Sequence, residues 1–271
     1  MKRILPTFIL LLSSFLVFSQ EVKKVFHEVI DKLPVLYASN SELYPISISL
    51  ELELTNYTFS EGNKRIFVIP PKTEKLKLGG LTVGNSRERA TFGYKYKVAM
   101  GDVTNKKMDK DYQYDLPFQK GESYKLWQGY NGSFSHQDEN SLDFTMPEGT
   151  KIVAAREGVV VKVVQNNTQS CNTKECAKYN NYVTILHPDG TFANYVHIKF
   201  NGAVVKQGDE VKKGALIAHS GNVGWSSAPH LHFVCYAGDF GKRNTLETKF
   251  KIDAGNKSII LKEGTVYTRN Y

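Results

Sequence analysis

Residues 46–54 alternate apolar and polar side chains almost without interruption, in the order ISISLELEL. Successive side chains of a β-strand point to opposite faces, so this pattern predicts a strand with one buried and one solvated face. Shorter runs of this kind cover residues 65–69, 74–78 and 94–99, with turn signals at Pro70, Pro71, Gly79 and Gly80. Residues 20–120 are therefore predicted to form a β-sandwich of immunoglobulin-like size. No residue cluster there suggests chemistry, so we expect a spacer or docking module.

One stretch of this region departs from the strand pattern. Within residues 22–36, Val25, Val29 and Leu33 recur at near-helical spacing. The sequence therefore indicates a short helical period here, and a sustained one almost nowhere else.

The second half of the chain reads as short apolar strands separated by polar turns. His187, Pro188, Asp189 and Gly190 have the composition of a hairpin turn. The segment 204–221 contains glycines spaced as in the tight corners of small β-barrels. The strand-like runs are residues 151–155, 158–164, 182–186, 191–196 and 230–236. We expect an all-β domain of small sheets, or a barrel-type fold, over residues 121–240, with a C-terminal β extension over residues 241–271.

The first residues have the pattern of a secretory signal. Lys2 and Arg3 precede an apolar run and then small or polar residues, with cleavage expected before Gln20. The apolar run is shorter than the ~20 residues of a membrane-spanning helix, although an uncleaved anchor is an alternative. Residues 1–19 are therefore predicted to be a signal peptide, and the mature protein to be exported.

Composition narrows the class of protein. The hydrophobic fraction of 41% is ordinary for a globular chain and excludes general disorder. The formal net charge of +8 serves solubility, or attracts an anionic polymer such as cell wall. No basic run is interleaved with aromatic residues, so nucleic acid is not an expected partner.

Cysteine spacing suggests a local cross-link. Cys171 and Cys176 bracket a polar stretch, which outside the cytoplasm indicates a small disulfide loop. Metal binding by this pair is the alternative, but no second cysteine pair exists to complete a four-sulfur site. Cys235 lies in an apolar run and is expected to be a buried free thiol.

Two histidines occupy one face of a predicted strand. His230 and His232 are two residues apart, so their side chains point to the same side. Upstream, His136 begins a polar loop and Asp143 opens the apolar run after it. These two residues and one strand imidazole would make a three-ligand site with an open position, the layout of catalytic zinc. Judged from the two strand histidines alone, the alternative to metal binding or catalysis is that they are hydrogen-bonded structural residues.

Ordered motifs over residues 130–237 resemble peptidase family M23, the zinc peptidases of the lysostaphin and LytM type. The resemblance implies one zinc ion (Zn2+) per chain, held by His136, Asp143 and His232, with His197 and His230 as catalytic histidines. This chain departs from many members in placing the first two ligands seven positions apart with no glycine between them, and in having Val234 after the last motif. The motifs are the His136 and Asp143 pair, residues 147–160, Tyr195-Val196-His197, residues 208–221 and Pro229-His230-Leu231-His232-Phe233.

The chemistry of such a site assigns roles to its neighbours. Zinc lowers the pKa of a bound water and polarises the scissile carbonyl. His230 is predicted to be the general base and His197 to stabilise the oxyanion, and these two roles could be exchanged. Tyr195, Asn222 and Ser226 are candidate substrate-groove residues. We expect His187 and His219 to be surface or loop residues.

The function implied by the resemblance is an exported zinc metallo-endopeptidase that hydrolyses peptide cross-links of peptidoglycan. We expect a periplasmic or secreted monomer, whose N-terminal sandwich docks to an envelope protein or covers the groove. One alternative is a catalytically silent relative that binds and activates another cell-wall hydrolase; the presence of all five histidine and aspartate positions argues against it. The other is a secreted peptidase acting on glycine-rich proteins.

Overall fold

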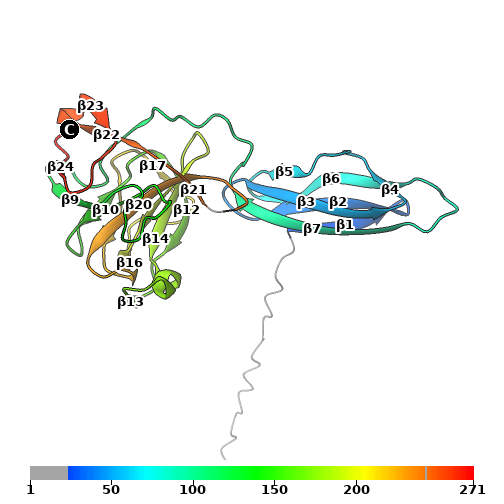
Figure 1. Cartoon of the computed structure of the whole chain (residues 1–271), viewed down its shortest axis with the longest axis horizontal. Helices are drawn as coiled ribbons and strands as arrows, with labels where there is room; N and C mark the ends of the chain where they lie inside the picture. Colours follow the sequence, from blue (N-terminus) through cyan, green and yellow to red (C-terminus); the bar gives the residue numbers. More distant parts are fainter. Residues whose placement is uncertain (1–23, 242) are drawn as a thin grey trace, which may run out of the picture.

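A computed structural model describes residues 24–241 and 243–271 (Figure 1). The predicted signal peptide, residues 1–19, lies outside this described part. The described chain is almost entirely β-structure, with short 3-10 turns, as the alternating pattern predicts. Its elements are β1 (Val25–Ile30), β2 (Leu33–Asn40), β3 (Ile46–Thr55), β4 (Tyr57–Phe59), β5 (Ile66–Ile69), β6 (Thr73–Val83), β7 (Thr91–Met100), β8 (Gln113–Tyr114), β9 (Ser123–Gln128), β10 (Ser141–Thr145), β11 (Lys151–Val153), β12 (Gly158–Val164), β13 (Ser170–Cys171), η1 (Lys174–Tyr179), β14 (Tyr182–Leu186), β15 (Phe192–Val196), β16 (Ile198–Ala203), β17 (Glu210–Val211), β18 (Leu216–Ser220), β19 (Gly224–Trp225), β20 (His230–Ala237), β21 (Asn244–Leu246), β22 (Lys249–Ile252), η2 (Asp253–Gly255), β23 (Lys257–Ile259) and β24 (Val266–Thr268).

Two sheets of the N-terminal region pack face to face as a sandwich. One has the strand order β1-β2-β6-β4 and the other the order β5-β3-β7. In β3, Ile48 and Leu50 are buried in the core between the sheets, whereas Glu51 and Glu53 are exposed. The apolar half of the alternating pattern therefore makes the sandwich core, because burying each such side chain contributes about 2 kcal/mol.

The helical period suggested around Val25 and Leu33 is wrong, because these residues form a hairpin of β1 and β2. Its two-residue turn has positive φ at both Asp31 (50°) and Lys32 (68°), as in a type I′ turn. Asp-Lys is not the Asn-Gly or Asp-Gly pair that marks this turn in a sequence, which explains the misreading.

Gly79 and Gly80 also differ from expectation, since they lie inside β6 rather than in a turn. A Cβ at Gly79 would come within 2.4 Å of the Phe59 ring. Glycine is therefore required here by a buried aromatic side chain that approaches the backbone, and not by a change of chain direction.

The C-terminal region is organised around a nine-stranded sheet. Eight strands follow the order β17-β12-β14-β15-β20-β10-β9-β24, and β21 pairs with the far half of β20. One face of this sheet packs on the main core, with Phe144, Tyr195, Leu231 and Phe233 at most 1% exposed. Side chains alternate along a strand, so the chain neighbours of these four residues project from the opposite face of the sheet.

Smaller open sheets complete this region, and no barrel closes among the described strands. They have the orders β11-β18-β16, β23-β22-β8 and, as a parallel pair, β13-β19. The strands expected near the C-terminus are present, and β24 extends the large sheet by pairing with β9. Phe250 and Tyr267 of this segment are buried in the main core.

The sequence-based boundary at residue 120 differs from what the structure shows. Tyr114, Leu116 and Phe118 are buried in the main core of the C-terminal region, and β8 pairs with β22. The sandwich strands end instead at Met100, with β7. Residues 101–118 lack a strand pattern, so the sequence could not show which core they join.

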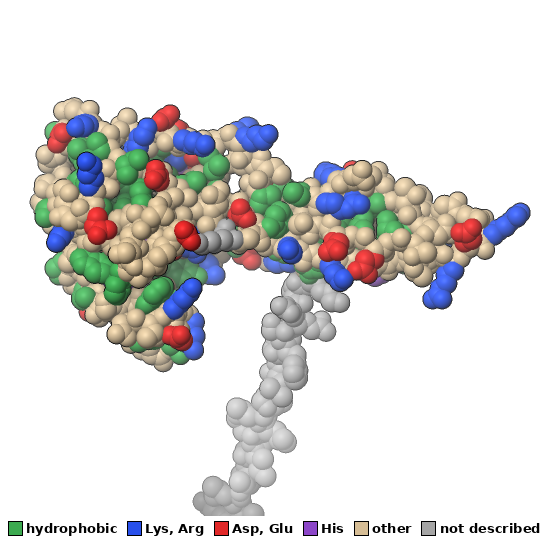
Figure 2. Space-filling view, in the orientation of Figure 1, with side chains coloured by type: hydrophobic (Ala, Val, Ile, Leu, Met, Phe, Trp, Pro, Cys, Tyr) green, Lys and Arg blue, Asp and Glu red, His purple; other side chains and the backbone are tan. Residues whose placement is uncertain are grey.

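An apolar junction connects the two regions. Phe192 and Tyr236 of the large sheet pack against the partly buried Leu43, Tyr44 and Met100 of the sandwich side. The Tyr44 and Phe192 rings meet edge to face with centroids 5.7 Å apart. Figure 2 shows the sandwich as a narrow arm beside a broader body. Within the described residues, none of the helices has the length and apolarity needed to cross a membrane.

Candidate metal centre and groove

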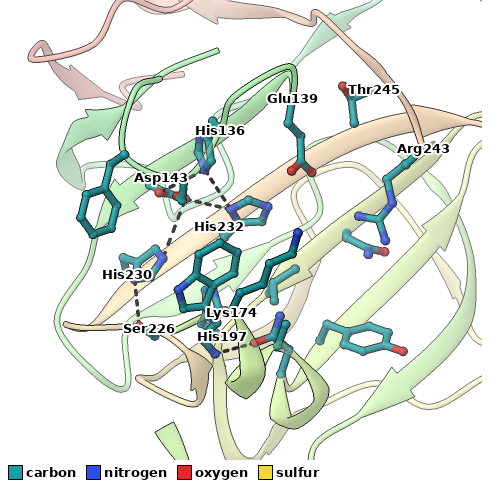
Figure 3. Close-up of a pocket in the computed structure, with 18 of the residues that line it drawn as sticks. His136, Glu139, Asp143, Lys174, His197, Ser226, His230, His232, Arg243 and Thr245 are labelled. Carbon is teal, nitrogen blue, oxygen red and sulfur yellow. Dashed lines mark hydrogen bonds and ion pairs between the residues drawn. The ribbon is translucent and has the colours of Figure 1, made fainter. Parts of the chain in front are cut away.

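Three predicted ligands converge above the large sheet (Figure 3). His136 Nε2 lies 3.2 Å from Asp143 Oδ2 and 3.3 Å from His232 Nδ1. His232 Nδ1 lies 2.9 Å from Asp143 Oδ1. Each side chain offers one ligand atom, and these atoms all lie within 4.8 Å of one another. The cluster therefore has the donors of a possible metal site.

Strand register explains why Asp143 and His232 meet. They are direct partners in the antiparallel pairing of β10 with β20. Their chain neighbours Phe144 and Leu231 point to the core and are fully buried. The alternation of core and site residues along both strands therefore anchors the Asp143 and His232 side chains on one rigid face.

His136 reaches the site from the loop before β10. Its backbone N–H donates to the Gly132 carbonyl, and its Nδ1–H donates to the Gly129 carbonyl at 3.0 Å. The second bond leaves Nε2 as the ring nitrogen that faces Asp143. The seven-residue step from His136 to Asp143 is thus accommodated by a folded loop that still presents a ligand atom.

Gln128 at the end of β9 organises this loop, and sequence reasoning missed it. Its side-chain N–H groups donate to Asp143 Oδ2 at 3.1 Å and to Ser135 Oγ at 2.8 Å. Its carbonyl accepts from the backbone N–H groups of Phe134 and Ser135, both at 3.0 Å. A lone glutamine at a strand end carries no sequence signal, because its role depends on contacts with residues up to 15 positions away.

The charges within the cluster support one another. Burial alone would raise the pKa of Asp143, but hydrogen bonds from His136 and His232 hold it well below its usual range. Burial would lower the pKa of His136, but the bond and the charge of Asp143 raise it. Asp143 is therefore a carboxylate at neutral pH, which is the state that a metal ion requires of a ligand.

His197 lies beside the cluster on a kinked backbone. It sits between β15 and β16 with a φ of 66°, uncommon for a residue other than glycine. Its Nδ1–H donates to the Val223 carbonyl at 2.8 Å, so its Nε2 carries the lone pair of the neutral ring. Burial, with the nearby charges of His230 and His232, holds the pKa of His197 well below its ordinary value.

His230 has a matching arrangement on β20. Its Nδ1–H donates to the Ala228 carbonyl at 2.8 Å, and its Nε2 lies 3.8 Å from Asp143 Oδ1. The ring centroids of His197 and His230 are 4.6 Å apart. Burial lowers the pKa of His230 below its ordinary value. The structure thus places both predicted catalytic histidines next to the possible ligands, each with its Nδ1 bonded to a backbone carbonyl.

The cluster lines a groove with a volume of about 900 Å³. Trp127 and Phe134 stand on one wall with ring centroids 5.3 Å apart, and both are largely exposed. Trp225 belongs to the same lining, and Tyr44 and Met100 of the sandwich side line it too. The groove therefore offers exposed aromatic surface for an extended ligand and borders the N-terminal sandwich.

The three candidate groove residues have different positions. Ser226 lines the groove and has its Oγ 3.2 Å from His230 Nδ1. Asn222 accepts a hydrogen bond from Ser226 at 2.7 Å and is not among the lining residues. Tyr195 does not reach the groove: it is fully buried in the core, where its hydroxyl accepts the Ala155 N–H. Its strand position places it on the face opposite to Val196 and Asn194. Tyr195 therefore points away from the groove, although it is close to His197 in sequence.

Cys171 and Cys176 are joined by a disulfide with Cα atoms 5.8 Å apart. The bridge links β13 to η1, and Lys174 and Ala177 of η1 line the groove. Cys235 is free and buried. The disulfide therefore restrains one wall of the groove.

The two remaining C-terminal histidines were expected to be surface or loop residues, and neither is exposed. His187 is in the predicted turn but only 2% exposed, with its Nδ1–H bonded to the Glu157 carbonyl at 2.7 Å. Burial lowers its pKa to about 4. His219 is part of β18 and half-buried. Neither belongs to the possible metal cluster.

The donor set and spacing fit a tetrahedral metal. Zinc bonds of about 2.0–2.2 Å place tetrahedral ligand atoms about 3.3–3.6 Å apart. The two imidazole nitrogens are 3.3 Å apart, within that range, and each lies 2.9–3.2 Å from one oxygen of Asp143: His232 from Oδ1 and His136 from Oδ2. With one oxygen of Asp143 as the ligand, the three ligand atoms all lie within 4.8 Å of one another. Two imidazoles and one carboxylate are also suitable donors for a transition metal.

Part of the chain is similar to a known protein family. Residues 137–244 match Peptidase family M23. The chain is 35% identical to peptidoglycan DD-endopeptidase ShyA of Vibrio cholerae over 94 residues, 35% of this chain and 19% of that protein. It is 34% identical over 119 residues to glycyl-glycine endopeptidase ALE-1 of Staphylococcus capitis, 43% of this chain and 28% of that protein.

Among solved structures, the catalytic domain of lysostaphin from Staphylococcus simulans is 27% identical. The match covers 46% of this chain and 87% of that one, with a TM-score of 0.34. The chain spans less than a third of the length of the two curated relatives described above. The sequence matches carry the assignment: residues 137–244 of this chain form a domain of peptidase family M23.

Proposed function

We propose that this chain is an exported zinc metallo-endopeptidase that hydrolyses peptide cross-links of peptidoglycan. One observation carries the proposal: His136, Asp143 and His232 meet in a groove whose lining also includes His197 and His230. The names of the relatives, which include a peptidoglycan endopeptidase, support this choice of substrate. The signal-like first residues support export.

His136, Asp143 and His232 would hold one zinc ion. Two nitrogen donors and one carboxylate favour zinc over magnesium or calcium, which prefer oxygen ligands. Zinc held by three protein ligands lowers the pKa of a water in the open position and polarises a carbonyl. The chain's own contribution is to keep Asp143 ionised, through its contacts with both histidines, and to orient His136 through Gly129.

The paired histidines would handle the proton. His230 directs a lone pair at Nε2 toward the site and can accept a proton from the attacking water, then deliver it to the leaving amine. His197, whose ring lies beside His230, would stabilise the charge that develops on the substrate oxygen. Both rings are held alike through Nδ1, so the two roles can be exchanged.

The N-terminal sandwich has a proposed role as well. Tyr44 and Met100 bring its edge to the groove lining, which supports a part in docking to an envelope protein or in covering the groove. We place the working boundary after Met100, where the last sandwich strand ends. We propose that the protein acts as a monomer.

The decisive experiment measures zinc content by elemental analysis, beside digestion of purified sacculi. It compares the mature protein with His232→Ala. We expect about one zinc per chain and release of soluble peptides by the mature protein, with both lost in the variant.

Each of the other outcomes would favour a different function. Zinc without sacculus digestion would favour the silent relative that activates another hydrolase. Cleavage of a glycine-rich protein but not of sacculi would favour the second alternative. Absence of zinc after reconstitution would overturn the metallopeptidase proposal.

A further inference from the structure

A polar strip crosses the groove floor next to the metal ligands. Cross-strand pairing aligns Lys162 of β12 with Thr184 of β14, and Thr184 with Asn194 of β15. Direct partners in a sheet share a face, and all three residues line the groove. His232 lies on the same face, in the next cross-strand pair along β15: it pairs with Val196, which is two residues from Asn194.

The amide of Asn194 is the unusual member of this strip. Its side-chain oxygen accepts hydrogen bonds from the hydroxyls of Thr184 at 2.7 Å and Tyr236 at 3.4 Å. Its NH2 group has no partner among the described residues, although Asn194 is only 6% exposed. A nearly buried amide is seldom left without a partner for its donors. This group therefore presents two N–H donors to whatever occupies the groove.

Three cations line the same groove as those donors. Arg243 stacks its guanidinium 4.6 Å from the centre of the Tyr236 ring, whose hydroxyl bonds Asn194. Lys162 rises from the strip itself, and Lys174 enters from the disulfide loop. Figure 3 shows Arg243 and Lys174 with their charged ends in the groove. Across residues 24–241 and 243–271, none of the three cations forms an ion pair.

The acidic groups of the groove are placed differently. Glu139 and Asp138 lie on the loop that carries His136, and both line the same groove. The acidic side chains of the groove thus come from the His136 loop, whereas the basic ones come from β12, the disulfide loop and Arg243. A ligand that fits this arrangement carries a negative group over the strip.

The distance from the metal ligands sets where that negative group lies. Neighbouring strands are about 4.8 Å apart and alternate residues of one strand about 6.7 Å apart, so Asn194 is roughly 8 Å from His232 along the sheet. That span equals about two residues of extended peptide. Planar N–H forks such as those of Arg and an amide match the two oxygens of a carboxylate.

We propose that Asn194, Arg243 and Lys162 form a carboxylate subsite, which selects peptides carrying a free carboxylate about two residues from the scissile bond. Lys174 adds positive charge from the disulfide loop. The inference rests on the proposed function and deepens it: it assigns this groove to acidic branched stem peptides and not to uncharged glycine bridges.

The test uses a cross-linked stem-peptide dimer with free carboxylates, the same dimer with those groups converted to carboxamides, and pentaglycine. Zinc-loaded full-length protein is compared with Arg243→Gln and Asn194→Asp, with Lys120→Gln as the matched surface control. We expect kcat/KM for the acidic dimer to fall about 10- to 100-fold in Arg243→Gln, mainly through KM. The amidated dimer should react equally poorly with the wild type and this variant, and Lys120→Gln should behave as the wild type.

Binding separates this inference from the proposed function. Isothermal titration of metal-depleted protein measures the Kd of both dimers without hydrolysis. Tighter binding of the acidic dimer, weakened by Arg243→Gln, supports the subsite even if no peptide is cleaved. Lack of cleavage would then contradict only the proposed enzymatic function. Equal Kd values for the two dimers, or an unchanged Kd in Arg243→Gln, would overturn the subsite even if sacculi are digested. Arg243 is exposed, so this variant decides the matter if Asn194→Asp fails to fold.

Discussion

The sandwich and the large sheet are both built from alternating strands, yet they bury different side chains. The sandwich core is almost wholly apolar, with Asn40 and Ser47 as its buried polar residues in the described chain. The region around the large sheet buries several histidines, Asp143, Gln128 and Arg156. Burying such groups is costly unless each finds partners.

The difference shows where the chain accepts a cost in stability for chemistry. In the sandwich, Asn40 is held by backbone carbonyls and serves to shape a turn. In the large sheet, buried polar groups contact one another, as Asp143 does with His136 and His232. Networks of this kind are expected at sites of binding or catalysis. Five changes in the large-sheet region test that distinction, and three of them are matched by a change in the sandwich.

Removal of a buried carboxylate should have the largest effect. Asp143→Ala takes away the oxygen donor between His136 and His232, so we expect loss of bound metal and a fall in kcat/KM well beyond ~100-fold. Elemental analysis and sacculus digestion measure both quantities. Glu53→Ala on the sandwich, where the carboxylate is exposed, should change neither. Full metal content in Asp143→Ala would contradict the ligand assignment.

Loss of a paired histidine should abolish turnover but spare the metal. His230→Ala or His197→Ala should lower kcat/KM about 100- to 10,000-fold, because proton transfer is lost, with zinc still at about one per chain. The control is His27→Ala on β1, which should retain full activity. Simultaneous loss of zinc in both variants would instead make these histidines part of the metal site.

Core truncations should separate stability from metal binding. Phe233→Ala lies behind His232 and should cost about 3–5 kcal/mol of unfolding free energy, while also weakening metal binding by moving β20. Leu36→Ala in the sandwich core should cost about 2–5 kcal/mol with metal affinity unchanged. Denaturant unfolding and zinc titration test the pair. Equal loss of metal affinity in both would mean that the two regions are strongly coupled.

Acid should destabilise the large-sheet region through His187. Its pKa is about 4 in the folded protein and about 6.5 when unfolded, so the unfolded chain binds a proton first as the pH falls. Stability is therefore lost between about pH 6.5 and pH 4, by about 3 kcal/mol at most.

His187→Asn removes this titration and can keep the bond to the Glu157 carbonyl. Denaturant unfolding at a series of pH values should show a shallower loss of stability in His187→Asn than in the wild type. Arg156 and Asp189 face the same site and are unchanged in both proteins. Parallel stability curves would show that His187 is not the group responsible.

The smallest effect is expected from Gln128. Gln128→Leu removes the hydrogen bonds to Asp143 and to the His136 loop, so we expect zinc affinity to fall about 10-fold. Competition with a chelator measures this. Gln113→Ala, on an exposed position of β8, should leave the affinity unchanged. An unchanged affinity in Gln128→Leu would show that Asp143 needs no such support.

Local patterns made much of the architecture predictable. The alternation in residues 46–54 corresponds to β3, and residues 158–164 correspond to β12. The failures are equally local: the Asp31 and Lys32 turn has no glycine to announce it, and Gly79 faces an aromatic ring that only folding brings near. Propensity identifies a strand but not the distant side chain that packs on it.

Site residues divide in the same way. His136, Asp143, His197, His230 and His232 were singled out by residue type, spacing and resemblance, and the structure brings all five together. Tyr195 was misplaced because its nearness to His197 in sequence says nothing about which face it occupies. Gln128 and Asn194 were missed, because an isolated amide has no spacing pattern.

By itself, the sequence determined the all-β class, the strands and the shared face of His230 and His232, because side-chain alternation is a property of neighbouring residues. Only the tertiary structure decided which strands lie beside β20. Pairing β20 with β10 places Asp143 opposite His232, and pairing it with β15 places Asn194 one row away from that pair. Strand order depends on packing and hydrogen bonds between distant segments, which no local pattern encodes.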